Sequence, residues 1–195
     1  MTRVLIEISL ADQCLRWSAP GAGAKDYPVS TAANGPGEMH GSGCTPRGWH
    51  RVRARIGQDA PPGSVFIARR PTGEIFDASL ARREPDRDWI LTRILWLSGE
   101  EPGRNRLGQV DSMRRFIYIH GCPDSEPMGV PRSAGCIRMH DDAILDLFER
   151  TPVGSRVHIR EDALPNGREW TRATGISNRC DDDGPITTDF GAGGD

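Results

Sequence analysis

Residues 116–139, FIYIHGCPDSEPMGVPRSAGCIRM, constrain the fold of this chain more than any other stretch. Aromatic and β-branched residues crowd the first four positions, which predicts a β-strand that ends at His120. Glycines and prolines then make the following segment a shaped loop. The loop closes on Cys136 and returns the chain to an apolar environment. We therefore expect a sulfur and an imidazole that are distant in sequence to meet in space.

The residue types at the two ends of this loop predict nucleophilic chemistry. A free thiol has a pKa of about 8.5, so little of it is ionised at neutral pH. An imidazole within hydrogen-bond reach can take the thiol proton and leave a thiolate–imidazolium pair. Such a pair attacks a carbonyl carbon and returns the proton to a leaving amine. We interpret Cys136 as the nucleophile and His120 as its base.

Two other interpretations of these residues stay open at this stage. A cysteine taken alone is most often a small buried hydrophobe. A metal site is the second alternative, although the spacing matches no common zinc pattern. Its candidate ligands are His40, Cys44, His120, Cys122 and Cys136.

The composition predicts one turn-rich, mainly β domain. A length of 195 residues suffices for a single sizeable core, and 23 glycines and 15 prolines indicate many turns. The net charge of −2 gives no general attraction to nucleic acid or to an anionic membrane surface. No apolar run is long enough to span a membrane. Five cysteines form too sparse and odd a set for a disulfide framework.

Local periodicity predicts most of the elements. The alternation from Arg3 to Leu10 predicts a half-buried strand, and the next apolar run completes a hairpin with it. Residues 89–97 fit either a buried strand or a short helix, and residues 80–88 look like an exposed charged connector. Two acidic residues at 141–142 start a helix that ends before Pro152. We expect further strands over residues 14–17, 27–31, 50–56, 64–70, 74–78 and 156–159.

Several short blocks carry a resemblance to a known family. His120-Gly121 and the block from Ser133 to Met139, S-A-G-C-I-R-M, follow Y-P-V-S-T at 27–31 and T-P-R-G at 45–48. In this order the blocks resemble the L,D-transpeptidase catalytic domain, the YkuD family. The resemblance covers about residues 3–160.

The resemblance implies a fold and a domain division. The fold is a compact, mainly β sandwich or barrel with one helix after the cysteine. The catalytic domain would occupy residues 1–160, followed by an extension over residues 161–195 that we expect to be largely mobile. The family's substrate implies a periplasmic or cell-envelope location. The apolar stretch at residues 4–6 is nevertheless too short for the core of a signal peptide, and we expect it to begin the first strand.

The resemblance also implies a reaction. Cys136 would attack the carbonyl between the third residue, a diamino acid, and the terminal D-alanine of a peptidoglycan tetrapeptide. The acyl-enzyme would pass to an amine, which gives a 3→3 cross-link, or to water, which gives L,D-carboxypeptidase activity. A non-catalytic member that binds cell-wall peptides is the alternative. The expected partners are peptidoglycan stem peptides and carbapenem-type β-lactams, and no metal or organic cofactor is required.

Supporting roles follow from the same resemblance. Gly135, Ser133 and Gly121 would shape the loop or the oxyanion site. Arg138 and Tyr118 would contact substrate, although Arg138 could equally lock the loop and Ser133 could simply hold it.

Three smaller expectations complete the site. The second ring nitrogen of His120 would face a main-chain carbonyl at Gly121 or Cys122. Oxidation could join Cys122 to Cys136 in a disulfide. Ala134 stands where many relatives have histidine, which removes one accessory donor.

Overall fold

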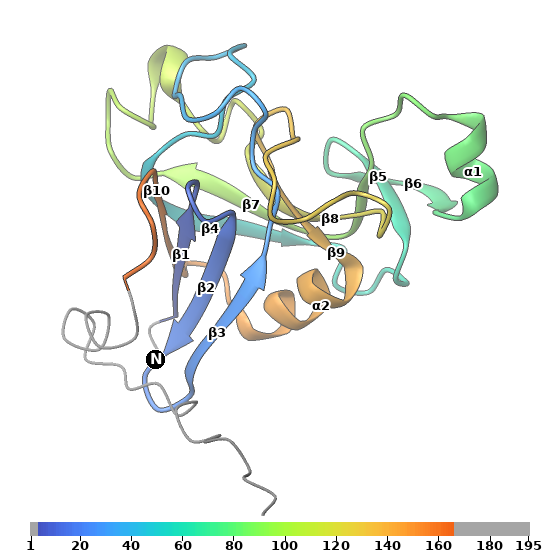
Figure 1. Cartoon of the computed structure of the whole chain (residues 1–195), viewed down its shortest axis with the longest axis horizontal. Coiled ribbons are helices and arrows are strands. Elements are labelled where there is room, and N and C mark those ends of the chain that lie inside the picture. Colours follow the sequence, from blue (N-terminus) through green and yellow to red (C-terminus); the bar gives the residue numbers. More distant parts are fainter. Residues whose placement is uncertain (1–3, 166–195) are drawn as a thin grey trace, which may run out of the picture.

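The computed structural model describes residues 4–165 of the 195-residue chain. One ten-stranded sheet in the order β3-β2-β1-β10-β4-β7-β5-β6 curls through the molecule, and β8 and β9 branch from β7 (Figure 1). The strands are β1 (Leu5–Ser9), β2 (Cys14–Ala19), β3 (Gly23–Pro28), β4 (Gly48–Ile56), β5 (Ser64–Ile67), β6 (Arg70–Ile75), β7 (Ile90–Gly99), β8 (Tyr118–Cys122), β9 (Ile137–His140) and β10 (Arg156–Arg160). The mainly β fold predicted from the sequence is confirmed.

The two ends of the domain meet in the middle of the sheet. β1 pairs antiparallel with β2, as the hairpin prediction requires, and parallel with β10 on its other side. Ile6 and Ile8 of β1 are fully buried in the largest core cluster, together with Val157 and Ile159 of β10. The predicted first and last strands are therefore confirmed, and their pairing closes the core.

The helix after Cys136 is α2 (Asp141–Arg150), which the sequence predicted. Its buried residues Ile144, Leu147 and Phe148 belong to the same core cluster. Acidic side chains in its first turn are favourable beside the positive end of the helix dipole. Because His140 is both the last residue of β9 and the N-cap of α2, the helix fixes the end of that strand.

Three local predictions are wrong or incomplete. Residues 78–83 form a second short helix, α1 (Ala78–Arg83), capped by Asp77, whose carboxylate accepts from the Leu80 amide at 2.7 Å. Six residues are too few to show a helical period. The β5–β6 hairpin reverses at Ala68, where φ is +54°, and not at residues 71–73 as expected. Residues 89–97, whose sequence fits either a strand or a short helix, lie mostly in β7.

The strand that carries His120 also differs from the prediction. β8 begins at Tyr118, because Phe116 lies in a turn with a φ of +58°. His120 is therefore the middle residue of β8 and not its last. The strand continues because Gly121 pairs with β7 and with β9, and Cys122 pairs with His140 of β9.

The expected C-terminal extension lies mostly outside the described residues, which end at residue 165. Its first residues fold back on the domain: the carboxylate of Glu161 pairs with Arg47 at 2.7 Å, and the Leu164 amide donates to Asp12 at 2.6 Å. Within residues 4–165, neither helix has the length and apolar character needed to cross a membrane.

Candidate active site

The parallel pairing of β8 with β9 places the site. Ile119 lies opposite Ile137, and His120 lies opposite Arg138. Ile119 and Ile137 are fully buried in the main core cluster. Because side chains alternate between the faces of a sheet, His120 and Arg138 lie next to each other on the opposite face.

Cys136 joins His120 on this face. It directly precedes β9 and packs against a separate cluster that contains Ile94 and Tyr118. Ile94 is the residue of β7 that pairs with His120. Cys136 thus lies beside Tyr118 and diagonal to His120 across the β8–β9 pair. The structure brings both ends of the predicted pair to one face of the sheet.

The imidazole of His120 is buried and oriented. Its Nδ1 lies 2.8 Å from the carbonyl oxygen of Gly121, which confirms the expected main-chain partner. A carbonyl only accepts, so Nδ1 carries the proton and Nε2 keeps its lone pair. Nε2 makes no hydrogen bond with any residue between 4 and 165. Burial lowers the pKa of His120 below 6.5, which keeps the ring neutral at pH 7.

The thiol of Cys136 is half-buried and protonated at rest. It donates to the carbonyl oxygen of Phe116 at 3.4 Å. Burial raises its pKa to about 12; the Tyr118 backbone amide and the Arg138 charge oppose this rise, and the Asp88 charge adds to it. Burial of both groups thus favours the neutral thiol and the neutral imidazole over the thiolate–imidazolium pair. Two neutral groups face the same site, and the thiol ionises only when its proton is taken.

Ser133 and Gly135 shape the turn that presents Cys136. The Ser133 hydroxyl donates to the Cys136 carbonyl at 2.5 Å and accepts from the Gly135 amide at 3.2 Å. Gly135 has a φ of +130°, and a Cβ there would lie 3.2 Å from the Cys44 carbonyl oxygen. Thr45 fixes the Gly135 carbonyl with a hydrogen bond of 3.0 Å. These contacts support the loop-holding roles of Ser133 and Gly135.

Gly121 is needed for close packing behind His120. A Cβ at this position would lie 2.6 Å from the Leu91 carbonyl oxygen and from Asp141 Oδ1. Neither neighbour is the end of a long flexible chain, so a larger residue would displace β7 or the start of α2. The Gly121 carbonyl also orients the His120 ring.

The two predicted substrate-contact residues differ in accessibility. Tyr118 is only 2% exposed, and its hydroxyl accepts from Arg69 at 2.8 Å. This placement makes Tyr118 a wall beneath Cys136, and a direct contact with substrate requires Arg69 to move. The Arg138 guanidinium is held by two carboxylates, those of Asp88 at 2.6 Å and Glu126 at 3.4 Å.

Sequence reasoning missed four residues around the sulfur. Phe116 supplies the carbonyl that accepts from the thiol, and Arg69 stacks over its ring at 4.8 Å. Asp88 reaches Arg138 across fifty residues, and Arg115 donates to the carbonyls of the 37–44 loop. No local pattern marks these contacts, because each joins segments that only the fold brings together.

The alternatives drawn from the cysteines do not fit the structure. Within residues 4–165 no three or more His, Cys, Asp or Glu side chains gather where they could hold a metal ion. Cys122 is buried and pairs with His140, four positions beyond Cys136. At about 3.3 Å per residue the two cysteines lie about 13 Å apart, too far for a disulfide.

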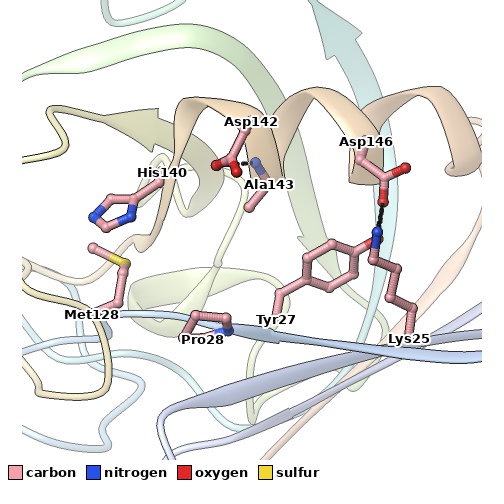
Figure 2. Close-up of a pocket in the computed structure, with 8 residues that line it drawn as sticks. All are labelled: Lys25, Tyr27, Pro28, Met128, His140, Asp142, Ala143 and Asp146. Atoms are coloured by element: carbon pink, nitrogen blue, oxygen red, sulfur yellow. Dashed lines mark hydrogen bonds and ion pairs between the residues drawn. The ribbon is translucent and has the colours of Figure 1, made fainter.

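A well-formed cavity lies elsewhere, between β3 and α2. It has a volume of about 280 Å³ and includes neither Cys136 nor His120 in its lining. Figure 2 shows Tyr27 and Lys25 reaching from β3 to Asp146 on α2, with hydrogen bonds of 2.5 and 3.0 Å. These internal bonds join the edge strand to the helix, which is a structural role.

Comparison with known proteins places the chain in a family. The family model described as the L,D-transpeptidase catalytic domain, YkuD, matches residues 3–159. The chain belongs to the L,D-transpeptidase catalytic-domain family. It is similar to the probable L,D-transpeptidase ErfK/SrfK of Escherichia coli K12, with 26% identity over 140 residues that cover 56% of this chain and 44% of that protein.

Two further proteins are similar to this chain, one in sequence and one in fold. YqjB of Bacillus subtilis 168 is 48% identical over 48 residues, 25% of this chain and 27% of that protein. The structure of Bd1075 from Bdellovibrio bacteriovorus shares the fold with a TM-score of 0.50 at 15% identity, covering 89% of this chain and 56% of that one. The matched segments thus span less than two thirds of each of these relatives.

Proposed function

We propose that the protein is a cysteine-dependent L,D-transpeptidase that acts on peptidoglycan tetrapeptide stems. The observation that carries the proposal is the placement of Cys136 and His120 on one face of the β8–β9 pair, with the free Nε2 of a neutral imidazole available as a base. Family membership supplies the substrate class.

The first half-reaction acylates the enzyme. His120 Nε2 takes the proton of the Cys136 thiol, and the sulfur attacks the carbonyl between the diamino acid and the terminal D-alanine. The raised pKa of the thiol means that this transfer accompanies attack. The resulting imidazolium then protonates the departing amine of D-alanine, which leaves a thioester on Cys136.

The second half-reaction consumes the thioester. An amine of another stem peptide gives its proton to His120 as its nitrogen attacks, which forms a 3→3 cross-link and restores the thiol. Water in the same place gives a tripeptide, the L,D-carboxypeptidase outcome. The turn built by Ser133 and Gly135 holds the Cys136 backbone rigid through both steps.

Arg138 is the group we assign to the donor's terminal carboxylate. It lies two positions from Cys136 on the same face, about 7 Å along β9. A guanidinium presents two parallel donors that fit a carboxylate. Tyr118 supports the sulfur from beneath, since its buried ring packs in the cluster that Cys136 contacts.

Carbapenem-type β-lactams would use the same nucleophile. Their strained carbonyl is opened by sulfur, with the imidazolium protonating the ring nitrogen. The product is a stable thioester or a slowly hydrolysed one on Cys136. No metal or organic cofactor takes part in the proposed chemistry.

Incubation with a peptidoglycan tetrapeptide, followed by mass analysis, tests the proposal. We expect D-alanine release together with a cross-linked dimer or a tripeptide, and loss of both products on Cys136→Ala. Cys14→Ala is the matched control, because Cys14 is a partly buried thiol on β2 with no place in the proposed site, and it should retain turnover. A wild-type protein that binds the peptide without releasing D-alanine would contradict the enzyme and favour a non-catalytic peptide-binding protein.

A further inference from the structure

Arg138, which we assign to the donor's terminal carboxylate, is already paired with Asp88 in the structure. Arg138 Nη2 and Asp88 Oδ1 are 2.6 Å apart, and Arg138 Nη1 lies 3.4 Å from a Glu126 oxygen. The guanidinium thus faces two carboxylates in the free protein. A third carboxylate, from a donor peptide, meets a site that already carries one excess negative charge.

The two partners of this pair are held very differently. The Arg138 side chain is 13% exposed, and its backbone pairs with both His120 and Ser30. The Asp88 side chain is 58% exposed and comes from the segment between α1 and β7. When the pair opens, Asp88 is therefore the member that moves.

The neighbours of Asp88 stay in place when its side chain turns. Trp89 is buried, and Arg87 stacks over its ring at 4.5 Å while pairing with Glu74 at 2.8 Å. Both flanking residues are anchored, so a change of the Asp88 rotamer alone is enough to expose the guanidinium.

The space around the Arg138 guanidinium is too small for a further carboxylate unless one already there moves away. A cavity of only about 20 Å³ lies among Asp88, Trp89, Cys122, Glu126 and Arg138. That volume is enough for about one water molecule. A donor carboxylate therefore has no room beside the present pair, and one that takes the shorter contact to Arg138 takes the position of Asp88.

We propose that Asp88 is a specificity-determining residue that occupies the carboxylate subsite on Arg138 until the terminal carboxylate of a donor peptide replaces it. This inference rests on the proposed function, since it assumes a donor whose scissile carbonyl lies at Cys136. The terminal carboxylate belongs to the next residue, one chain step of about 3.8 Å away, so a donor that runs along β9 brings it to Arg138. A donor without that charge gains nothing from displacing Asp88.

Peptide binding to the Cys136→Ala protein tests the exchange without requiring turnover. The probes are a peptidoglycan tetrapeptide ending in D-alanine and the same peptide with a terminal carboxamide, measured by calorimetry. Adding Asp88→Asn removes the competing charge of an exposed ion pair, an interaction that corresponds to about two- to fivefold in affinity. We expect the Kd of the carboxylate peptide to fall by this factor and the Kd of the carboxamide to stay the same.

Asp86→Asn is the matched control, because Asp86 is an exposed acid in the same segment. It should change neither Kd. An unchanged Kd for the carboxylate peptide on Asp88→Asn, an equal change for both peptides, or an equal effect of Asp86→Asn overturns the inference, as does absence of binding. Turnover by the wild-type protein is a separate measurement, so the enzyme proposal can fail while the exchange at Arg138 stands.

Discussion

Two buried histidines, His50 on β4 and His120 on β8, show what separates a structural imidazole from a candidate base. Both are almost fully buried, and each donates from Nδ1 to a main-chain carbonyl, at 3.0 Å to Gly48 and 2.8 Å to Gly121. Burial lowers the pKa of both rings. Neither burial nor the orienting hydrogen bond therefore distinguishes them.

The difference lies in the second ring nitrogen. His50 Nε2 is 2.9 Å from the Ser112 hydroxyl. The Ser112 hydroxyl has one proton and also lies 3.0 Å from the Asn105 carbonyl oxygen. That carbonyl already accepts from the Ser112 amide at 2.9 Å, and with the His50 proton on Nδ1 only Nε2 can accept, so we assign the hydroxyl proton to His50 Nε2. The lone pair of His50 Nε2 therefore accepts a hydrogen bond. In contrast, no residue between 4 and 165 makes a hydrogen bond to His120 Nε2, which lies on the face that carries Cys136. A free lone pair beside a thiol is what catalysis needs.

Replacing each histidine by glutamine should give the largest difference between the two sites. His120→Gln removes the proposed base, and general-base catalysis contributes about 10²- to 10⁴-fold. We expect tetrapeptide turnover per folded molecule to fall by that factor. His50→Gln, equally buried, should leave turnover of the folded fraction within about twofold of wild type. Steady-state D-alanine release, with the folded fraction measured by circular dichroism, checks both; equal losses in the two variants would end the distinction.

The pH dependence of unfolding tests the structural role of His50. Its pKa is about 4 in the folded protein against 6.5 for the free side chain, so the unfolded chain binds the extra proton between these values. The proton uptake of His50 therefore leaves the free energy of unfolding unchanged above pH 6.5. As the pH drops from 6.5 to 4, it lowers the free energy of unfolding by about 3 kcal/mol. Urea unfolding from pH 7 to 4 should show a decline that is smaller by this amount in His50→Gln. Parallel curves for the two proteins would contradict the assignment.

Ser112→Ala tests the smallest difference, the hydrogen bond that occupies His50. Loss of the hydroxyl leaves a buried ring nitrogen without a donor, which costs about 1–2 kcal/mol. We expect the urea midpoint to drop accordingly with tetrapeptide turnover unchanged, since the hydrogen-bond partners of His50 are Gly48 and Ser112 and do not include Cys136. A folded Ser112→Ala protein without turnover would contradict this, because it would show that the His50–Ser112 pair affects the candidate active site.

The sequence predicted the members of the site better than its geometry. Alternation over residues 3–10 and the acidic start at Asp141 identified β1 and α2, because local periodicity and capping determine those elements. The block around Cys136 predicted a nucleophile at that position through family resemblance. These signals are all contained in short stretches of chain.

Contacts between segments that are distant in the chain could not be predicted from the sequence. The pairing of His120 with Arg138 depends on a parallel register between strands separated by a loop. The contact of Asp88 with Arg138 joins residues fifty positions apart in the chain. The protonated state of Cys136 follows from burial, which only packing sets. Each is a property of the assembled sheet and not of any segment.

Acylation by a carbapenem, followed by intact-protein mass over time and by peptide mapping, tests the central claim most directly. Wild type and His50→Gln should each gain the mass of one drug molecule on the peptide that contains Cys136, and His120→Gln should acylate at least about a hundredfold more slowly. An adduct on another residue, no adduct on folded wild-type protein, or a His120→Gln rate equal to wild type would contradict the pairing of Cys136 with His120.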